Sequence, residues 1–128
     1  MHGDGAVTVH RRAFAKSATL GAVLQLAIAG LGHLIPALRD AGLFPIGGTL
    51  VGGFAGLRLA RRSAGIPTAR ALGRGGMAGA VGGALGALAS TLLGDVPPNT
   101  IFIAGMSTLV AGFVGGVLGR ILPQARTA

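Results

Sequence analysis

The chain has 128 residues, of which 51% are hydrophobic and only 11% are charged. At this length, and with a mean hydropathy of +0.71, we expect one compact membrane domain with no soluble domain beside it. The absence of cysteine excludes disulfides, zinc-thiolate sites and thiol catalysis. The formal net charge is +8, but the basic residues flank apolar stretches and the chain has no Trp or Tyr on which bases could stack, so we expect no nucleic-acid partner.

Four long uncharged stretches account for most of the chain. Hydrocarbon offers no water to pair backbone amides, so each stretch is expected to cross the bilayer as a helix. The sequence therefore predicts an all-α polytopic membrane protein with four transmembrane helices, arranged as two tandem helical hairpins. The stretches are Ser17–Leu38, Ala41–Leu57, Gly75–Gly94 and Val96–Gly119; a basic arm, residues 1–16, precedes one transmembrane domain, residues 17–122, and residues 123–128 form a tail.

The segment before the first stretch has two interpretations. The pair Arg11-Arg12 with Lys16, followed by apolar residues and the small residues Ala27-Ile28-Ala29, resembles a twin-arginine export signal with a cleavage site. The same basic flank is also what a retained first helix needs. Because the apolar run continues through Leu38, longer than a usual export signal, we expect the first span to be retained.

The basic residues predict the orientation. The first hairpin loop holds only Arg39, beside Asp40, and the loop Asp95 to Asn99 holds no basic residue. Since positive residues stay on the cytoplasmic side, we expect a multi-pass protein of the inner membrane with both termini and the central loop inside. The expected topology anchors are Arg11, Arg12, Lys16, Arg58, Arg61, Arg62, Arg70, Arg74 and Arg120, and Arg126 follows them in the tail.

The two halves of the chain resemble each other. Thr49 to Gly56 and Thr108 to Gly115 share the pattern T-L-V-x-G-F-x-G, at an offset of 108 − 49 = 59 positions. We therefore expect a duplicated hairpin, with halves of about residues 17–58 and 75–120. Each half has two spans and enters the membrane from the same side, so the repeat is parallel and implies no midplane site of the inverted-repeat kind.

Glycines recur at helical spacing in the last three spans. Residues four apart share one helix face, and glycine on such a face lets helix backbones approach closely in lipid, where association depends on van der Waals contact. We expect these stripes to pack the helices of one chain, or alternatively to face a neighbouring subunit or a pore. The helix-packing glycines are Gly48, Gly52, Gly56, Gly75, Gly79, Gly83, Gly112 and Gly116.

Polar side chains within the spans are few. Gln25 is the only amide in a span, and we expect it to form one interhelical hydrogen bond, with a pore-lining role as the alternative. The hydroxyls of Ser90, Thr91, Ser107 and Thr108 are expected to bond backbone carbonyls of their own helices. A possible polar path would consist of Gln25, Thr49, Ser90, Thr91, Ser107 and Thr108.

No residue pattern points to chemistry. His33, Asp40 and Asp95 are expected at the same membrane face, but their spacing matches no metal-ligand motif, so we expect no metal and no cofactor. There is no catalytic triad, and the glycine runs lack the Lys-Ser/Thr of a phosphate loop. No charge lies deep in a span, which disfavours ion-coupled transport. We expect no catalytic residues and no enzymatic activity.

One family resemblance rests on two segments. Leu50 to Arg62, followed by the glycine-rich run Arg74 to Gly86, is similar to the small bacterial membrane proteins known as transglycosylase-associated proteins. The similarity covers residues 47–121, and this chain carries an additional span. The resemblance implies a stress-linked protein of the cell envelope without established catalytic residues.

These observations favour a non-enzymatic membrane module, structural or stress-related, that associates with itself or with another membrane protein within the bilayer. The first alternative is an oligomeric channel or holin-like pore for small solutes, which would need a polar stripe along one helix face. The second is an accessory subunit whose partner supplies the chemistry.

Overall fold

The computed structural model describes residues 4–62 and 67–122, and these residues form five helices. Segments of the four long helices are long and apolar enough to cross a membrane: Phe14–Leu34, Leu43–Arg62, Thr68–Leu92 and Thr100–Ile121. The predicted all-α fold with four membrane-spanning helices is therefore confirmed. The helices are α1 (Asp4–Leu34), α2 (Pro36–Asp40), α3 (Leu43–Arg62), α4 (Thr68–Leu92) and α5 (Thr100–Ile121).

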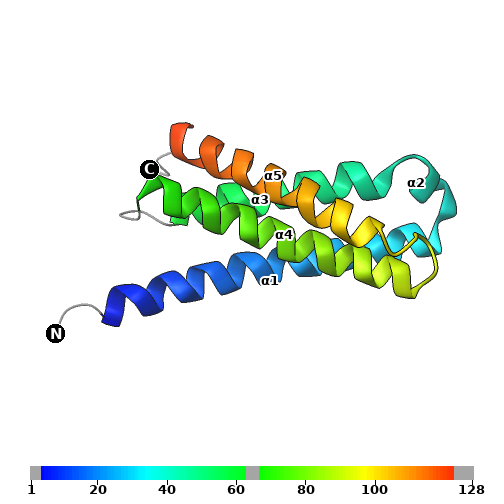
Figure 1. The fold of residues 1–128 in the computed structure, drawn as a ribbon, viewed down its shortest axis with the longest axis horizontal. Helices are drawn as coiled ribbons and strands as arrows, with labels where there is room; N and C mark the ends of the chain where they lie inside the picture. Colours follow the sequence, from blue (N-terminus) through cyan, green and yellow to red (C-terminus); the bar gives the residue numbers. More distant parts are fainter. Residues whose placement is uncertain (1–3, 63–66, 123–128) are drawn as a thin grey trace, which may run out of the picture.

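The four long helices lie side by side along the long axis of the molecule (Figure 1). The first residues of α1 and α4 and the last residues of α3 and α5 lie at one end of the bundle, and α2 lies at the other. Since α3 and α5 run in the same direction, they form a parallel pair. All nine predicted topology anchors belong to the first parts of α1 and α4 or to the last parts of α3 and α5. We call the end of the bundle where these parts lie the basic end, and the opposite end the α2 end.

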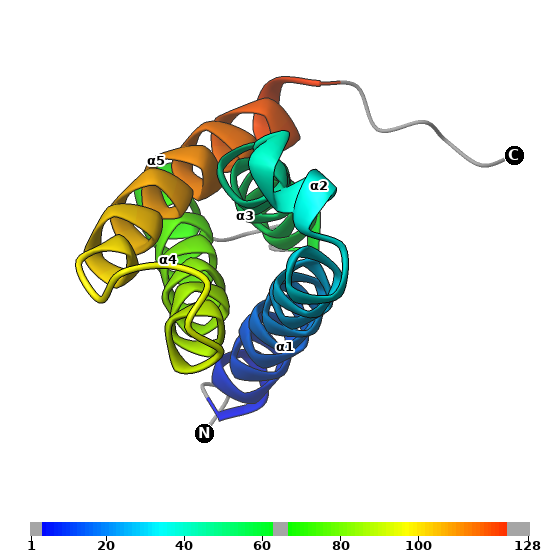
Figure 2. The same cartoon turned by 90° about the vertical axis from the view of Figure 1, so that its right-hand side faces the viewer.

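The bundle is not symmetrical in cross-section. Viewed along its axis, α3 and α4 lie between α1 and α5 (Figure 2). Helix α5 packs on α3 and α4, and α1 packs on α3 and α4 from the other side. Within the described part of the chain, α1 and α5 do not contact each other.

The first span ends earlier than the uncharged stretch predicts. Pro36 has no backbone N–H and disfavours the helical conformation of the residue before it, and Ile35 accordingly has φ −127° and ψ 86°. The stretch predicted to continue through Leu38 therefore divides into α1, which ends at Leu34, and the short α2. Gly42, with φ +86°, then turns the chain into α3.

The last span begins later than predicted. Helix α4 ends in a Schellman motif, in which Gly94 has φ +80° and the N–H of Asp95 donates to the carbonyl of Ser90 at 2.9 Å. Two prolines follow, and α5 begins only at Thr100. Val96 belongs to this connection rather than to the helix. The tail, including Arg126, lies outside the described residues.

Glycine contacts hold α3, α4 and α5 together. A Cβ added to Gly52 would lie 2.9 Å from the carbonyl oxygen of Thr108, and one added to Gly112 would lie 2.5 Å from that of Gly75. Cβ atoms on Gly56 and Gly79 would overlap the carbonyl oxygens of Gly112 and Thr108. All eight predicted helix-packing glycines are buried within this one chain, as intramolecular packing requires.

Small residues fill the interior and large apolar ones cover the outside. Among the described residues, the buried apolar side chains are those of alanines and of Leu59. Leu50 and Phe102, by contrast, are 68% and 74% exposed. Water disfavours such a surface, whereas lipid is as apolar as these side chains. The distribution fits a bundle packed by close backbone contact in a bilayer.

Candidate functional site: a cavity toward the α2 end

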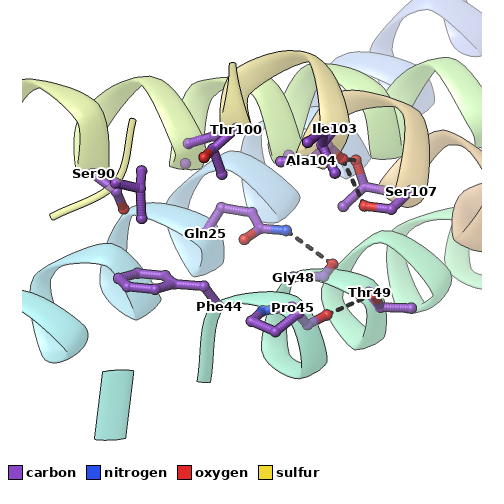
Figure 3. A pocket seen from close by; sticks show the side chains of 15 residues that line it. Gln25, Phe44, Pro45, Gly48, Thr49, Ser90, Thr100, Ile103, Ala104 and Ser107 are labelled. Carbon is purple, nitrogen blue, oxygen red and sulfur yellow. Dashed lines mark hydrogen bonds between the residues drawn. The ribbon is translucent and has the colours of Figure 1, made fainter. Parts of the chain in front are cut away.

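A cavity of about 140 Å³ lies among α1, α3, α4 and α5 (Figure 3). Its lining includes the first residues of α3 and α5, so it lies in the half of the bundle nearer the α2 end. Phe44, Val96 and Ile103 contribute apolar walls. None of the residues that line it is ionisable. Its polar lining consists of Gln25, Thr49, Ser90, Thr100, Ser107 and Thr108.

Gln25 projects into this cavity from α1 and is only 5% exposed. Its Nε2 donates a hydrogen bond of 2.9 Å to the carbonyl oxygen of Gly48 on α3, which confirms the predicted interhelical bond. Gly86 on α4 makes room for it, since an added Cβ there would lie 2.9 Å from the Cβ of Gln25. The Gly48 bond fixes the amide orientation and leaves Oε1 as an acceptor without a hydrogen bond from the described residues.

Most of the hydroxyl groups in the cavity lining donate hydrogen bonds to backbone carbonyls of their own helices. Thr49 donates to the carbonyl of Pro45 at 2.6 Å, Ser107 to that of Ala104 at 3.1 Å, and Thr108 to the same carbonyl at 2.7 Å. The backbone bonds predicted for Ser107 and Thr108 are confirmed. Each of these oxygens keeps lone pairs that can accept a further hydrogen bond.

Ser90 and Thr91 differ from the rest of the predicted polar path. The hydroxyl of Thr91 donates to the carbonyl of Ala87 at 2.9 Å, as predicted, but Thr91 does not line the cavity. The backbone bond predicted for Ser90 is wrong, because its Oγ is buried and has no hydrogen-bond partner among the described residues. The structure thus brings together Gln25, Thr49, Ser90, Ser107 and Thr108, and leaves Thr91 on a neighbouring face of α4.

Thr108 marks the inner limit of the cavity. Added Cβ atoms on Gly79 and Gly83 of α4 would overlap the carbonyl and hydroxyl oxygens of Thr108, and one on Gly52 of α3 would lie 2.9 Å from its carbonyl oxygen. From there toward the basic end, close glycine contacts such as that of Gly56 with Gly112 occupy the α3–α5 interface. In this structure the polar lining therefore ends at Thr108.

A charged cluster joins the connections at the α2 end. The side chain of Asp95 is only 5% exposed; it accepts a hydrogen bond of 3.0 Å from Arg39 Nη1, and His33 Nδ1 lies 3.1 Å from its Oδ2. Arg39 also lies 3.5 Å from Asp40. His33 and Asp95 do share one face as predicted, but the described residues contain no group of three His, Asp or Glu side chains that could hold a metal ion.

Sequence reasoning missed the role of Arg39 in this cluster. Its signal was present, because Arg39 is the one basic residue in the first hairpin loop and the uncharged stretches on either side bring it to the same membrane face as Asp95. The cluster links the end of α1, helix α2 and the α4–α5 connection. Its arrangement is that of a structural clamp.

No protein-family model, curated protein or solved structure matches the chain. The resemblance to transglycosylase-associated proteins therefore stays a prediction. What can be inferred about function depends on the geometry of the bundle and its cavity.

Proposed function

We propose that the chain is a non-enzymatic integral membrane module, in which α3, α4 and α5 form a rigid glycine-packed unit and α1 covers one side of it. The observation that carries this proposal is the burial of all eight helix-packing glycines against backbone or side chains of the same chain. A role in the cell envelope under stress rests only on the family resemblance. The inner membrane, with both termini in the cytoplasm, is the location that the basic end favours.

A duplicated hairpin is part of this proposal. Gly56 contacts the carbonyl of Gly112, and Gly115 contacts the carbonyl of Gly53. At the repeat offset of 59, Gly56 of α3 corresponds to Gly115 of α5 (56 + 59 = 115), and Gly53 corresponds to Gly112 (53 + 59 = 112). Replacing each glycine by its counterpart in the other half therefore turns the first contact into the second. A parallel repeat about an axis along the bundle would produce this exchange, so the pair of contacts supports it.

Self-association remains a prediction and needs another surface. The predicted glycine stripes are buried inside the chain, so they are not free to contact a second copy. A second copy, or another membrane protein, would have to pack on the large apolar side chains that face outward, such as Leu50 and Phe102. An accessory subunit would use the same surface.

A channel is the second candidate, because most of the predicted polar path lines one cavity. To conduct a solute, α3 and α5 would have to separate beyond Thr108, which would break the backbone contacts of Gly56, Gly112 and Gly115. These contacts favour the packing module.

Solute flux in proteoliposomes tests the choice. The packing module predicts that vesicles with the protein take up glycerol and urea no faster than protein-free vesicles. Uptake that is faster in wild type and lost in Ala104→Leu, which places bulk in the cavity, would instead support the channel. Ala27→Leu, on the exposed face of α1, is the matched control for added bulk.

A further inference from the structure

We infer that the cavity is a binding site for a small neutral molecule that donates a hydrogen bond, such as a phenol or a short alcohol. This inference goes beyond the packing role, since the bundle would fold with the site empty or filled. It rests on the unused acceptor of Gln25, on the charge and hydrogen-bonding character of the lining, on the cavity's volume, and on a neighbouring groove on the lipid-facing surface.

The first argument is the unpaired acceptor. Gln25 is only 5% exposed and its Nε2 is committed to Gly48, so Oε1 lies at the cavity without a hydrogen bond from the described residues (Figure 3). An amide oxygen that is withdrawn from bulk water without gaining a partner carries a desolvation cost. A ligand that donates to Oε1 would remove this cost.

The second argument is the character of the remaining polar atoms. Thr49, Ser107 and Thr108 already donate their hydroxyl hydrogens to backbone carbonyls, so each offers only lone pairs. The hydroxyls of Ser90 and Thr100 have no hydrogen bond to the described residues, so each can either donate or accept. With mostly acceptors and no ionisable side chain, the lining suits a donor and gives an anion no compensating charge.

The third argument is size. The cavity measures about 140 Å³, and an apolar protein cavity of about 150 Å³ holds a benzene molecule. Water could pair with the polar lining, but it would leave the apolar walls of Phe44, Val96 and Ile103 without an apolar partner. A single molecule with an apolar body and one hydroxyl matches both parts of the lining.

The fourth argument is access from the membrane. Thr49 and Ser107 line the cavity and also one end of an apolar groove along the outside of α3 and α5. That groove continues past Phe54 and Val114 on the surface that faces lipid. A neutral amphipathic molecule dissolved in the bilayer could therefore reach the site between Thr49 and Ser107.

The experiment compares phenol with fluorobenzene, which has a similar shape but cannot donate a hydrogen bond. Full-length protein in nanodiscs is titrated with fluorobenzene and followed by fluorine NMR, with empty nanodiscs as the background; phenol is then added as a competitor. We expect both to bind the wild type. In Gln25→Leu, which keeps an apolar side chain of similar size, the ratio of phenol affinity to fluorobenzene affinity should fall about three- to tenfold.

Two further variants test the location of the site. Ala87→Leu and Ala104→Leu each place bulk in the cavity and should abolish binding of both probes, while Ala27→Leu on the outside of α1 should leave it unchanged. Thermal unfolding shows which variants fold. If Gln25→Leu does not fold, loss of binding in either Ala87→Leu or Ala104→Leu still tests the location of the site. Equal binding by the filling variants and the wild type would overturn the inference, as would an unchanged affinity ratio in Gln25→Leu. Binding of neither probe by the wild type would mean that the cavity holds only water, and would also overturn it.

Discussion

Thr108 is the residue on which the glycine packing converges. Its backbone and hydroxyl lie against Gly52 from α3 and against Gly79 and Gly83 from α4. Threonine suits this position because its hydroxyl is satisfied by the carbonyl of Ala104 in its own helix, so it adds no unpaired donor at the contact. Glycine is needed on the opposing helices because any Cβ would meet the backbone or hydroxyl of Thr108.

A substitution at Gly79 should therefore be severe even when the new side chain is small. In Gly79→Ala the added Cβ overlaps the carbonyl oxygen of Thr108, and that backbone atom can move only if α4 and α5 separate. We expect a loss of about 1–3 kcal/mol in the free energy of unfolding, and a larger loss for Gly79→Ile. Thermal unfolding and size-exclusion chromatography in detergent measure it.

The matched control is Gly73→Ala on the same helix. Nothing lies within 4 Å of a Cβ built there, so the better helix propensity of alanine should leave stability unchanged or slightly higher. Leu85→Ile and Leu88→Ile, on the exposed face of α4, should also change little. Wild-type melting of Gly79→Ile would mean that this face of α4 is not a helix contact.

At the scale of the elements, α1 differs from the other three long helices. It packs on α3 and α4 through buried Ser17, Gly21 and Gln25, but it does not reach α5. At the α2 end the charged cluster adds an attachment, since Arg39 of α2 and His33 of α1 both contact Asp95 in the α4–α5 connection. The position of α1 and α2 therefore depends partly on this clamp.

Removing the clamp should loosen these elements without unfolding the core. Asp95→Ala deletes the buried carboxylate that Arg39 and His33 share, and we expect a loss of about 1 kcal/mol together with faster hydrogen exchange in α2 and the last turn of α1. Asp40→Ala is the control, because Asp40 is 73% exposed and lies 3.5 Å from Arg39. Equal exchange in the two variants would mean that the Asp95 cluster does not hold α2.

At the scale of the whole molecule, most of the positive charge lies at one end of the bundle. The nine topology anchors lie toward the basic end, and Arg39 at the α2 end is paired with Asp95 and Asp40. Cations near span ends set the orientation during insertion. We therefore expect the bundle to adopt one orientation in a bilayer.

Reporter fusions test this orientation. A cytoplasmic reporter should be active when fused at Ala128, and an external one when inserted at Asn99 in the α4–α5 connection, because the basic end is expected inside. The two fusions can be compared in the same strain and at matched expression. An external reporter active at Ala128 would reverse the orientation or require a different number of spans.

Retention of the first span is a separate expectation. Helix α1 contributes Gln25 to the cavity and buried Ala29 and Gly32 to the bundle, so its removal would expose small and polar residues of α3 and α4 to lipid. We expect mass spectrometry of the purified membrane protein to find residues 1–30 still attached. A mature chain that begins near Gly30 would favour the export-signal interpretation and a three-span bundle.

The sequence alone was sufficient for the number of spans, the helix faces that carry glycine and the shared end of the basic residues, because hydropathy, helical spacing and the order of spans are local properties of the chain. Spacing defines a helix face but not the helix that it meets, so only the tertiary structure decided that Gly79 and Gly83 both contact Thr108. Pro36 and Pro97-Pro98 are local signals for a helix end or a connection. The predicted spans included these prolines because they were defined by the absence of charge alone. The cavity exists because α1, α3, α4 and α5 leave space together near Gln25, and no single segment specifies such a space.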